Sequence, residues 1–109
     1  MPSTKMTPKA TYKAVAASQS DFVLGAAGAV GDVLAALIIT VNTAATAAVS
    51  IKDGNGASIG ILANSPGGGI GVYVVRFGED GITCLATTTP GWKVTTGAGS
   101  TVVAVGNFT

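Results

Sequence analysis

The alternation of apolar and polar residues is clearest in Val33–Asp53, and the rest of the chain is interpreted around this stretch. Val33–Val41 is almost wholly apolar and ends in β-branched residues, which favour a strand over a helix. A small polar step follows at Asn42–Thr46, and Ala47–Lys52 then alternates apolar and polar positions. We therefore predict two strands that pair back on each other and share a core. Because the first is apolar on both faces, we expect an interior strand, covered on both sides or on one side by a partner subunit.

The remaining chain consists of short apolar runs separated by turn residues. Asp53–Gly56 and Gly78–Gly81 are typical of hairpin turns, since Gly and Asn accept the positive φ that tight turns require. The further predicted strands are Phe22–Leu24, Ser58–Ala63, Ile70–Phe77, Ile82–Ala86, Trp92–Val94 and Thr101–Val105. About seven to nine short strands at this spacing, without a sustained helical period, predict an all-β fold, an antiparallel β-sandwich or barrel.

The first twenty residues differ from the rest of the chain. Residues 1–10 contain two of the four prolines and no apolar period, whereas residues 11–18 alternate weakly. The second segment is compatible either with a first edge strand or with a continuation of the arm. We expect an extended N-terminal arm over residues 1–20, which is not a signal peptide, and a single β-sandwich domain over residues 21–109.

Residues 22–41 have the length and hydropathy of a transmembrane segment and contain a single charge. That charge, Asp32, lies near the middle, where insertion costs about 3 kcal/mol. Gly25, Gly28 and Gly31 interrupt the first half, and neither end has a close basic flank. We therefore expect two strands joined by a turn, and a small membrane protein remains the least favoured alternative.

Charged residues make up 10% of the chain, against about 25% in an ordinary soluble domain. A free monomer normally stays soluble through surface charge, so we expect neighbouring subunits to cover much of this surface, although a neutral monomer remains an alternative. The net charge of +1 is unevenly distributed: Lys5, Lys9 and Lys13 give residues 1–20 a charge of +3, and three positive and five negative residues give the remainder −2. Three lysines could contact an acidic surface, but nucleic-acid binding normally requires clustered Lys and Arg residues across the domain, which this chain lacks.

The residue types that carry most catalysis and metal binding are rare or absent here. The chain has no histidine and one cysteine, Cys84, which excludes a Ser-His arrangement, an intrachain disulfide and a zinc site within one chain. Asp53–Asn64 does not match an EF-hand calcium loop. Its fifth position, which should supply a ligand, is Ala57, and its twelfth position, which should be a bidentate Glu, is Asn64. The glycine runs lack the Lys-Ser/Thr of a phosphate-binding loop. We expect no enzyme activity, no cofactor, no metal and no small-molecule substrate.

Two aromatic residues are candidates for an interface or for stacking on a ligand. Trp92 is the single tryptophan, and Tyr73 lies in an alternating strand. An exposed Trp on a β-domain can stack on a sugar or anchor a partner. A core or subunit-contact residue with a tethered indole N–H is the alternative, and it is more common in all-β domains.

Two runs of the chain carry a resemblance to a known family. Leu37–Gly54, LIITVNTAATAAVSIKDG, has an apolar strand ending in Val-Asn-Thr, an Ala/Thr-rich turn and a return strand that closes on Asp-Gly. This pattern resembles that of small structural proteins of tailed-bacteriophage virions, and Gly91–Val105, GWKVTTGAGSTVVAV, resembles the closing hairpin of the same proteins. The likeness covers about two-thirds of the chain and implies a β-sandwich or jelly-roll-like module, often trimeric, on the virion.

From this resemblance we expect a capsid decoration (cement) protein on the capsid exterior, a homotrimer that binds and stabilises the lattice of the major capsid protein. The arm residues Lys5, Lys9, Tyr12 and Lys13 would make capsid or subunit contacts. The alternative is a tail or fibre module that binds host-surface glycans through Trp92 and Tyr73. Neither function involves nucleic acid or a membrane.

Overall fold

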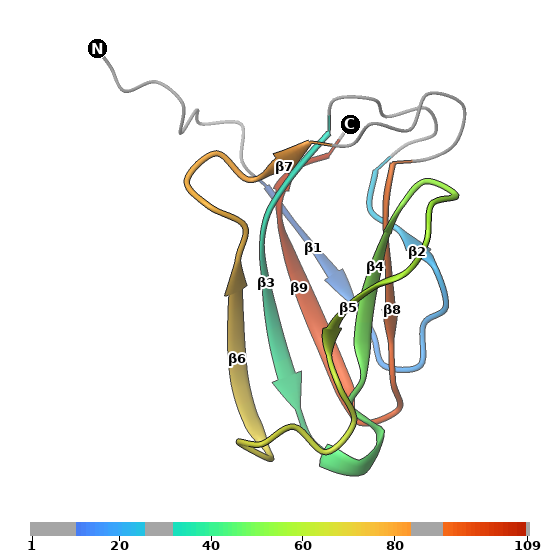
Figure 1. Ribbon diagram of the computed structural model, residues 1–109, viewed down its shortest axis with the longest axis vertical. Coiled ribbons are helices and arrows are strands. Elements are labelled where there is room, and N and C mark those ends of the chain that lie inside the picture. Colours follow the sequence, from blue (N-terminus) through green and yellow to red (C-terminus); the bar gives the residue numbers. More distant parts are fainter. Residues whose placement is uncertain (1–10, 26–31, 84–90, 109) are drawn as a thin grey trace.

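The computed structural model describes residues 11–25, 32–83 and 91–108, which form two antiparallel β-sheets packed face to face (Figure 1). Sheet A has the strand order β1-β9-β3-β6, and the short β7 also pairs with the beginning of β3. Its strands are β1 (Thr11–Val15), β9 (Ser100–Asn107), β3 (Val33–Val41), β6 (Gly71–Arg76) and β7 (Ile82–Thr83). Sheet B has the order β2-β8-β4-β5. Its strands are β2 (Phe22–Val23), β8 (Trp92–Thr96), β4 (Val49–Asp53) and β5 (Ile59–Leu62). The predicted all-β sandwich is confirmed.

The core lies between the sheets and is built from one face of each strand. Along β9 and β8 every second residue is buried, as the two-residue period of a strand requires. In β3 the same alternation is shifted by a bulge between Leu34 and Ala36, which keeps Leu34 and Leu37 both on the inner face. The buried apolar residues are Val15, Leu24, Leu34, Leu37, Ile39, Val41, Ala47, Val49, Ile51, Trp92, Val94, Val102 and Ala104.

The predicted pairing of the two strands in Val33–Asp53 is wrong. β3 pairs with β9, β6 and β7, whereas β4 pairs with β8 and β5 in the other sheet. The connection between them contains a single 3-10 turn, Ala44–Thr46, and carries the chain across the core as an arch. The two strands share a core, as expected, but they do so from opposite layers.

The run from Trp92 to Val105 is also an arch and not the closing hairpin that its sequence resembles. β8 belongs to sheet B and β9 to sheet A, and the turn between them crosses the sandwich. This turn lies against the β3–β4 arch at the same end of the molecule (Figure 1), where Asn42 N donates to Gly99 O at 2.7 Å and Gly99 N donates to Thr46 O at 3.0 Å. The two crossings therefore hold each other by backbone hydrogen bonds.

The other predicted turns differ in their outcome. Asp53–Gly56 joins β4 to β5 as a true hairpin, with Gly54 at φ 61° and Gly56 N donating to Asp53 O at 2.9 Å. Gly78–Gly81 is a turn, but the strands that it joins both pair with β3 and not with each other. Pro90, Cys84 and the end of the predicted strand Ile82–Ala86 lie outside the described residues.

The expected arm boundary at residue 20 is wrong, because residues 11–20 belong to the sandwich. β1 pairs with β9 over five consecutive residues, and Val15 is buried in the core. Beyond β1 the Thr96 hydroxyl donates to Ala16 O at 2.7 Å and accepts from Gln19 N at 3.0 Å. The edge-strand interpretation of residues 11–18 is the correct one, and residues 1–10 lie outside the described residues.

Candidate functional site: two unlike outer faces

The residues with candidate chemistry do not form a reaction centre in the described part of the chain. Among residues 11–25, 32–83 and 91–108, no group of three or more His, Cys, Asp or Glu side chains is placed to hold a metal ion. In the same ranges no helix has the length and hydropathy needed to cross a membrane. Residues 22–41, the hydrophobic segment of the sequence, contribute β2 and β3 to different sheets. The features of the described residues that bear on function are therefore the outer surfaces of the sandwich.

Trp92 is a core residue, which corrects its interpretation as a stacking residue. Its side chain is 4% exposed, and the indole N–H donates to the backbone carbonyl of Asp32 at 3.3 Å. A buried Trp usually satisfies its polar N–H in this way. The ring is therefore not available on the surface of a single subunit, and the alternative stated from the sequence, a tethered core residue, is the one observed.

Tyr73 is likewise turned toward the interior. It lies on the inner face of β6, packs against the core and donates its hydroxyl hydrogen to Gly69 O at 2.6 Å. Gly68 accommodates the ring, since a Cβ atom at that position would lie 2.7 Å from the Tyr73 hydroxyl oxygen. Trp92 and Tyr73 thus belong to different sheets, and the structure does not bring them together as a glycan platform.

The four predicted arm residues are divided between described and undescribed parts of the chain. Lys5 and Lys9 lie outside the described residues. Tyr12 and Lys13 both belong to β1, the edge strand of sheet A, and both are exposed. Their side chains point to opposite sides of the strand, and Tyr12, at 74% exposure, lies on the outer face of the sheet.

The outer face of sheet A is predominantly apolar. Cross-strand pairing aligns Ala14, Val103, Ile38 and Val74 in one row across the four long strands. The next row contains Tyr12, Val105, Ala36 and Arg76. A third row contains Thr101, Thr40 and Val72. Arg76 is the charged member of these three rows, so this face offers water very few polar partners.

The apolar side chains of this face are most exposed at its two edges. Val72 and Val74 on β6 are 64% and 55% exposed, and Tyr12 lies at the opposite edge on β1. Ile70, which immediately precedes β6, is also exposed. A contiguous apolar surface of this kind on a soluble protein marks an interaction site.

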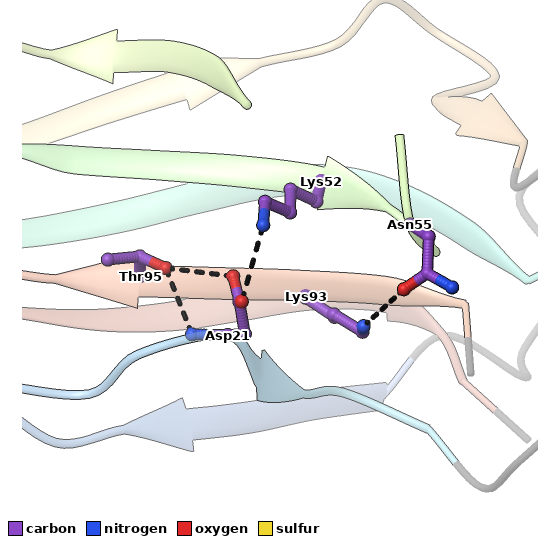
Figure 2. Close-up of polar contacts among 5 residues, drawn as sticks. All are labelled: Asp21, Lys52, Asn55, Lys93 and Thr95. Atoms are coloured by element: carbon purple, nitrogen blue, oxygen red, sulfur yellow. Dashed lines mark hydrogen bonds and ion pairs between the residues drawn. The ribbon is translucent and has the colours of Figure 1, made fainter. Parts of the chain in front are cut away.

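The outer face of sheet B has the opposite character (Figure 2). Lys52 and Lys93 lie directly opposite each other on β4 and β8, a pairing of like charges that destabilises a sheet. Asp21 offsets it, because its carboxylate lies 3.3 Å from the Lys52 Nζ, and Lys93 donates to the side-chain oxygen of Asn55 at 3.4 Å. The Thr95 hydroxyl donates to Asp21 Oδ1 at 3.3 Å and accepts from Asp21 N at 3.0 Å, which fixes the acid in place.

The sandwich therefore presents one face suited to water and one suited to contact with another apolar surface. The sequence carried a signal for this in β3, whose residues are apolar on both faces. It gave no indication that Val72 and Val74 would point outward, because their alternation with Tyr73 and Val75 fits either face of β6. Only the pairing of β6 with β3 determines which set is inside.

Comparison with known proteins adds no relative to this description: no known protein family, no curated protein and no solved structure matches this chain.

Proposed function

We propose that this chain is a structural subunit of a tailed-bacteriophage virion, a capsid decoration protein that acts as a homotrimer on the capsid exterior. The observation that carries the proposal is the contrast between the apolar outer face of sheet A and the charged, hydrogen-bonded outer face of sheet B. A subunit with one face of each kind is suited to occlusion on one side and exposure to water on the other. Charged residues make up only 10% of the chain, which supports the same interpretation.

The strand order supports an assignment to the jelly-roll architecture. Without β7, the described strands form two four-stranded sheets in which successive strands alternate between layers, except for the β4–β5 hairpin. Eight strands in two such sheets, linked as two Greek keys, define a jelly roll, a fold found in viral capsid proteins. Since a fold does not by itself imply a function, this assignment supports the proposal without carrying it.

The contact with the major capsid protein is assigned to the basic N-terminal segment. Lys5 and Lys9 precede β1 in the sequence, and Lys13 lies on β1 at one edge of sheet A, so the three positive charges fall within nine consecutive residues of the chain. An extended basic segment can lie on an acidic neighbouring subunit and add backbone pairing to an exposed strand. Such contacts would let the subunit bridge capsomers and stabilise the shell.

The proposal is tested by quantitative mass spectrometry of purified virus particles that encode this chain. Hundreds of copies per particle, in a fixed ratio to the major shell protein, are expected. A few copies per particle would place the chain in the tail and overturn the decoration role, and absence from particles would overturn any virion role. The glycan-binding alternative is not retained, because the ring of Trp92 is buried and Tyr73 packs against the core from the other sheet.

A further inference from the structure

We infer that the outer face of sheet A is the contact surface between three copies of this chain, arranged about a threefold axis with β1 of one copy beside β6 of the next. This inference deepens the proposed function and rests on its oligomeric part, since it names the surface and the partner that form the trimer. The partner is therefore a second copy of the chain, not a capsid protein or another ligand.

The width of sheet A suits threefold closure. Viewed down the threefold axis, the three sheets form the sides of a triangle. Each side contains the three spacings between the four strands of one sheet and one further spacing to the next copy. At about 4.8 Å per spacing, each side is roughly 19 Å wide. The centre of such a triangle lies about 5.5 Å from each sheet, close to the ~5 Å that is half the normal distance between packed sheets. The side chains of three copies would therefore fill the axis, whereas four copies would leave a central channel.

The distribution of exposed apolar side chains supports contact between opposite edges. Tyr12 lies at the β1 edge, and Val72 and Val74 lie at the β6 edge of the same face. A two-fold stack would leave both edges at its rim, but a head-to-tail ring brings the β1 edge of each copy against the β6 edge of its neighbour. Because every pair in the order β1-β9-β3-β6 is antiparallel, the two edges that meet also run antiparallel.

The charged residue of the face, Arg76, has a role in this arrangement. Tyr12 and Arg76 are the two ends of one cross-strand row. With the strands parallel to the threefold axis, cyclic symmetry adds no translation along them, so the row closes on itself and places Arg76 beside Tyr12 of the neighbouring copy. A guanidinium over a tyrosine ring is a favourable cation–π contact, which makes a lone positive charge tolerable at an apolar boundary.

The first experiment compares two matched substitutions by sedimentation equilibrium and native mass spectrometry. Val74→Glu introduces a charge on the outer face of sheet A, and Val23→Glu introduces the same charge on sheet B, opposite Lys93. The unmodified chain and Val23→Glu are expected to be trimers, and Val74→Glu a folded monomer at the same concentration. A monomeric or dimeric unmodified chain, or a trimeric Val74→Glu variant, would overturn the inference.

The second experiment does not depend on the folding of the glutamate variant. Ala14 and Val74 end the same row, three strand spacings or about 14 Å apart, too far for a disulfide within one copy. In a chain with Cys84→Ser, the pair Ala14→Cys and Val74→Cys should cross-link under oxidation into covalent trimers, and neither single variant should. Absence of cross-linked trimers would refute the head-to-tail arrangement.

Capsid binding separates this inference from the proposed function. A cross-linked trimer that does not bind purified capsids would leave the sheet A interface standing and remove the decoration role. A monomer that binds capsids would leave capsid binding standing and remove the sheet A interface.

Discussion

Gly97 and Gly99 show how single residues determine the way in which the two crossings of the sandwich meet. A Cβ atom on Gly97 would collide with the carbonyl group of Thr46, and one on Gly99 would collide with the carbonyl oxygen of Thr43. Both obstacles are backbone atoms, which cannot rotate away as a side chain can. These glycines are required by close approach of two backbones and not by turn conformation, since neither has a positive φ.

We predict that Gly99→Ala lowers the free energy of unfolding by about 1–3 kcal/mol, the usual cost of forced overpacking. Gly60→Ala is the matched control, because a Cβ atom there meets nothing within 4 Å, and it should change stability by less than about 0.5 kcal/mol. Urea denaturation followed by circular dichroism measures both values. Equal effects of the two substitutions would show that the arches do not need this contact.

Asp21 is a second residue whose position has an energetic consequence. It has a φ of 52°, and its carboxylate lies between Lys52 and the Thr95 hydroxyl (Figure 2). Asparagine also tolerates this backbone conformation, so Asp21→Asn removes the charge with little conformational cost. The carboxylate and Lys52 are 40% and 30% exposed, so solvent screening keeps the interaction weak.

We expect Asp21→Asn to cost about 0.2–1 kcal/mol of stability at low salt, because Lys52 and Lys93 are then left facing each other without an acid. In a Lys52→Met background the same substitution should cost less, and the double-mutant cycle gives the coupling. Thermal unfolding at 20 mM and 500 mM NaCl should show the effect shrinking with salt. An undiminished cost in the Lys52→Met background would mean that Thr95, not Lys52, is the important partner.

At the scale of the elements, strands were predictable from the sequence and their partners were not. Val33–Val41 was placed to the residue as a strand, because apolar and β-branched residues define it locally. Its pairing was missed, because a polar and small-residue step such as Asn42–Thr46 suits either a hairpin within a sheet or an arch between sheets. The same ambiguity applies to Thr96–Ser100. Asp53–Gly56 forms the predicted hairpin, whereas Gly78–Gly81, which also has glycines at positive φ, joins two strands that both pair with β3.

The positions of the candidate residues were likewise limited by strand pairing that the sequence does not reveal. Their types were evident in the sequence, but which side of a sheet they occupy depends on pairing that the sequence does not reveal. Trp92 was recognised as distinctive, yet its burial depends on β8 lying between β2 and β4. Tyr12 was assigned to an arm because residues 11–18 alternate weakly, and its strand is defined by β9, almost a hundred residues away.

The correction to the arm leads to a prediction about truncation. Removal of residues 1–10 should leave the melting temperature nearly unchanged and abolish binding to capsids. Removal of residues 1–20 should eliminate cooperative unfolding, because it deletes β1, the buried Val15 and the hydrogen bonds that Thr96 makes with Ala16 and Gln19. Loss of the buried Val15 side chain alone should lower the free energy of unfolding by about 1.5–3 kcal/mol.

Circular dichroism melting curves and co-sedimentation with capsids measure the two outcomes separately. A cooperative transition in the shorter truncation product would show that β1 is dispensable. Full capsid occupancy by the chain lacking residues 1–10 would show that Lys5 and Lys9 do not make the contact.

At the scale of the whole molecule, the proposed trimer has few charges where the copies meet. Arg76 is the charged side chain among the three rows of the outer face of sheet A, and its proposed partner is an uncharged ring. Burial of apolar surface is insensitive to simple screening, and sulfate strengthens it. The association should therefore respond to salts in the opposite way to an ion-pair interface.

We predict that raising NaCl from 50 mM to 1 M changes the trimer dissociation constant by less than about threefold, whereas ammonium sulfate tightens it. Sedimentation equilibrium across the salt series measures the constant. The stability increment from Asp21 and Lys52 on sheet B serves as an internal control, since it should fall over the same NaCl range. Dissociation by NaCl alone would contradict an apolar contact surface.

The position of β9 in sheet A has a consequence for biosynthesis. This strand lies between β1 and β3 and is the last of the described strands to be synthesised, so sheet A has no middle strand until β9 has left the ribosome. Until then the nascent polypeptide must hold the apolar residues of β1 and β3 without their partner strand, and unpaired strand edges are prone to aggregate. Chains interrupted before Ser100 should accordingly be insoluble or degraded, and any chaperone requirement should last until β9 has left the ribosome.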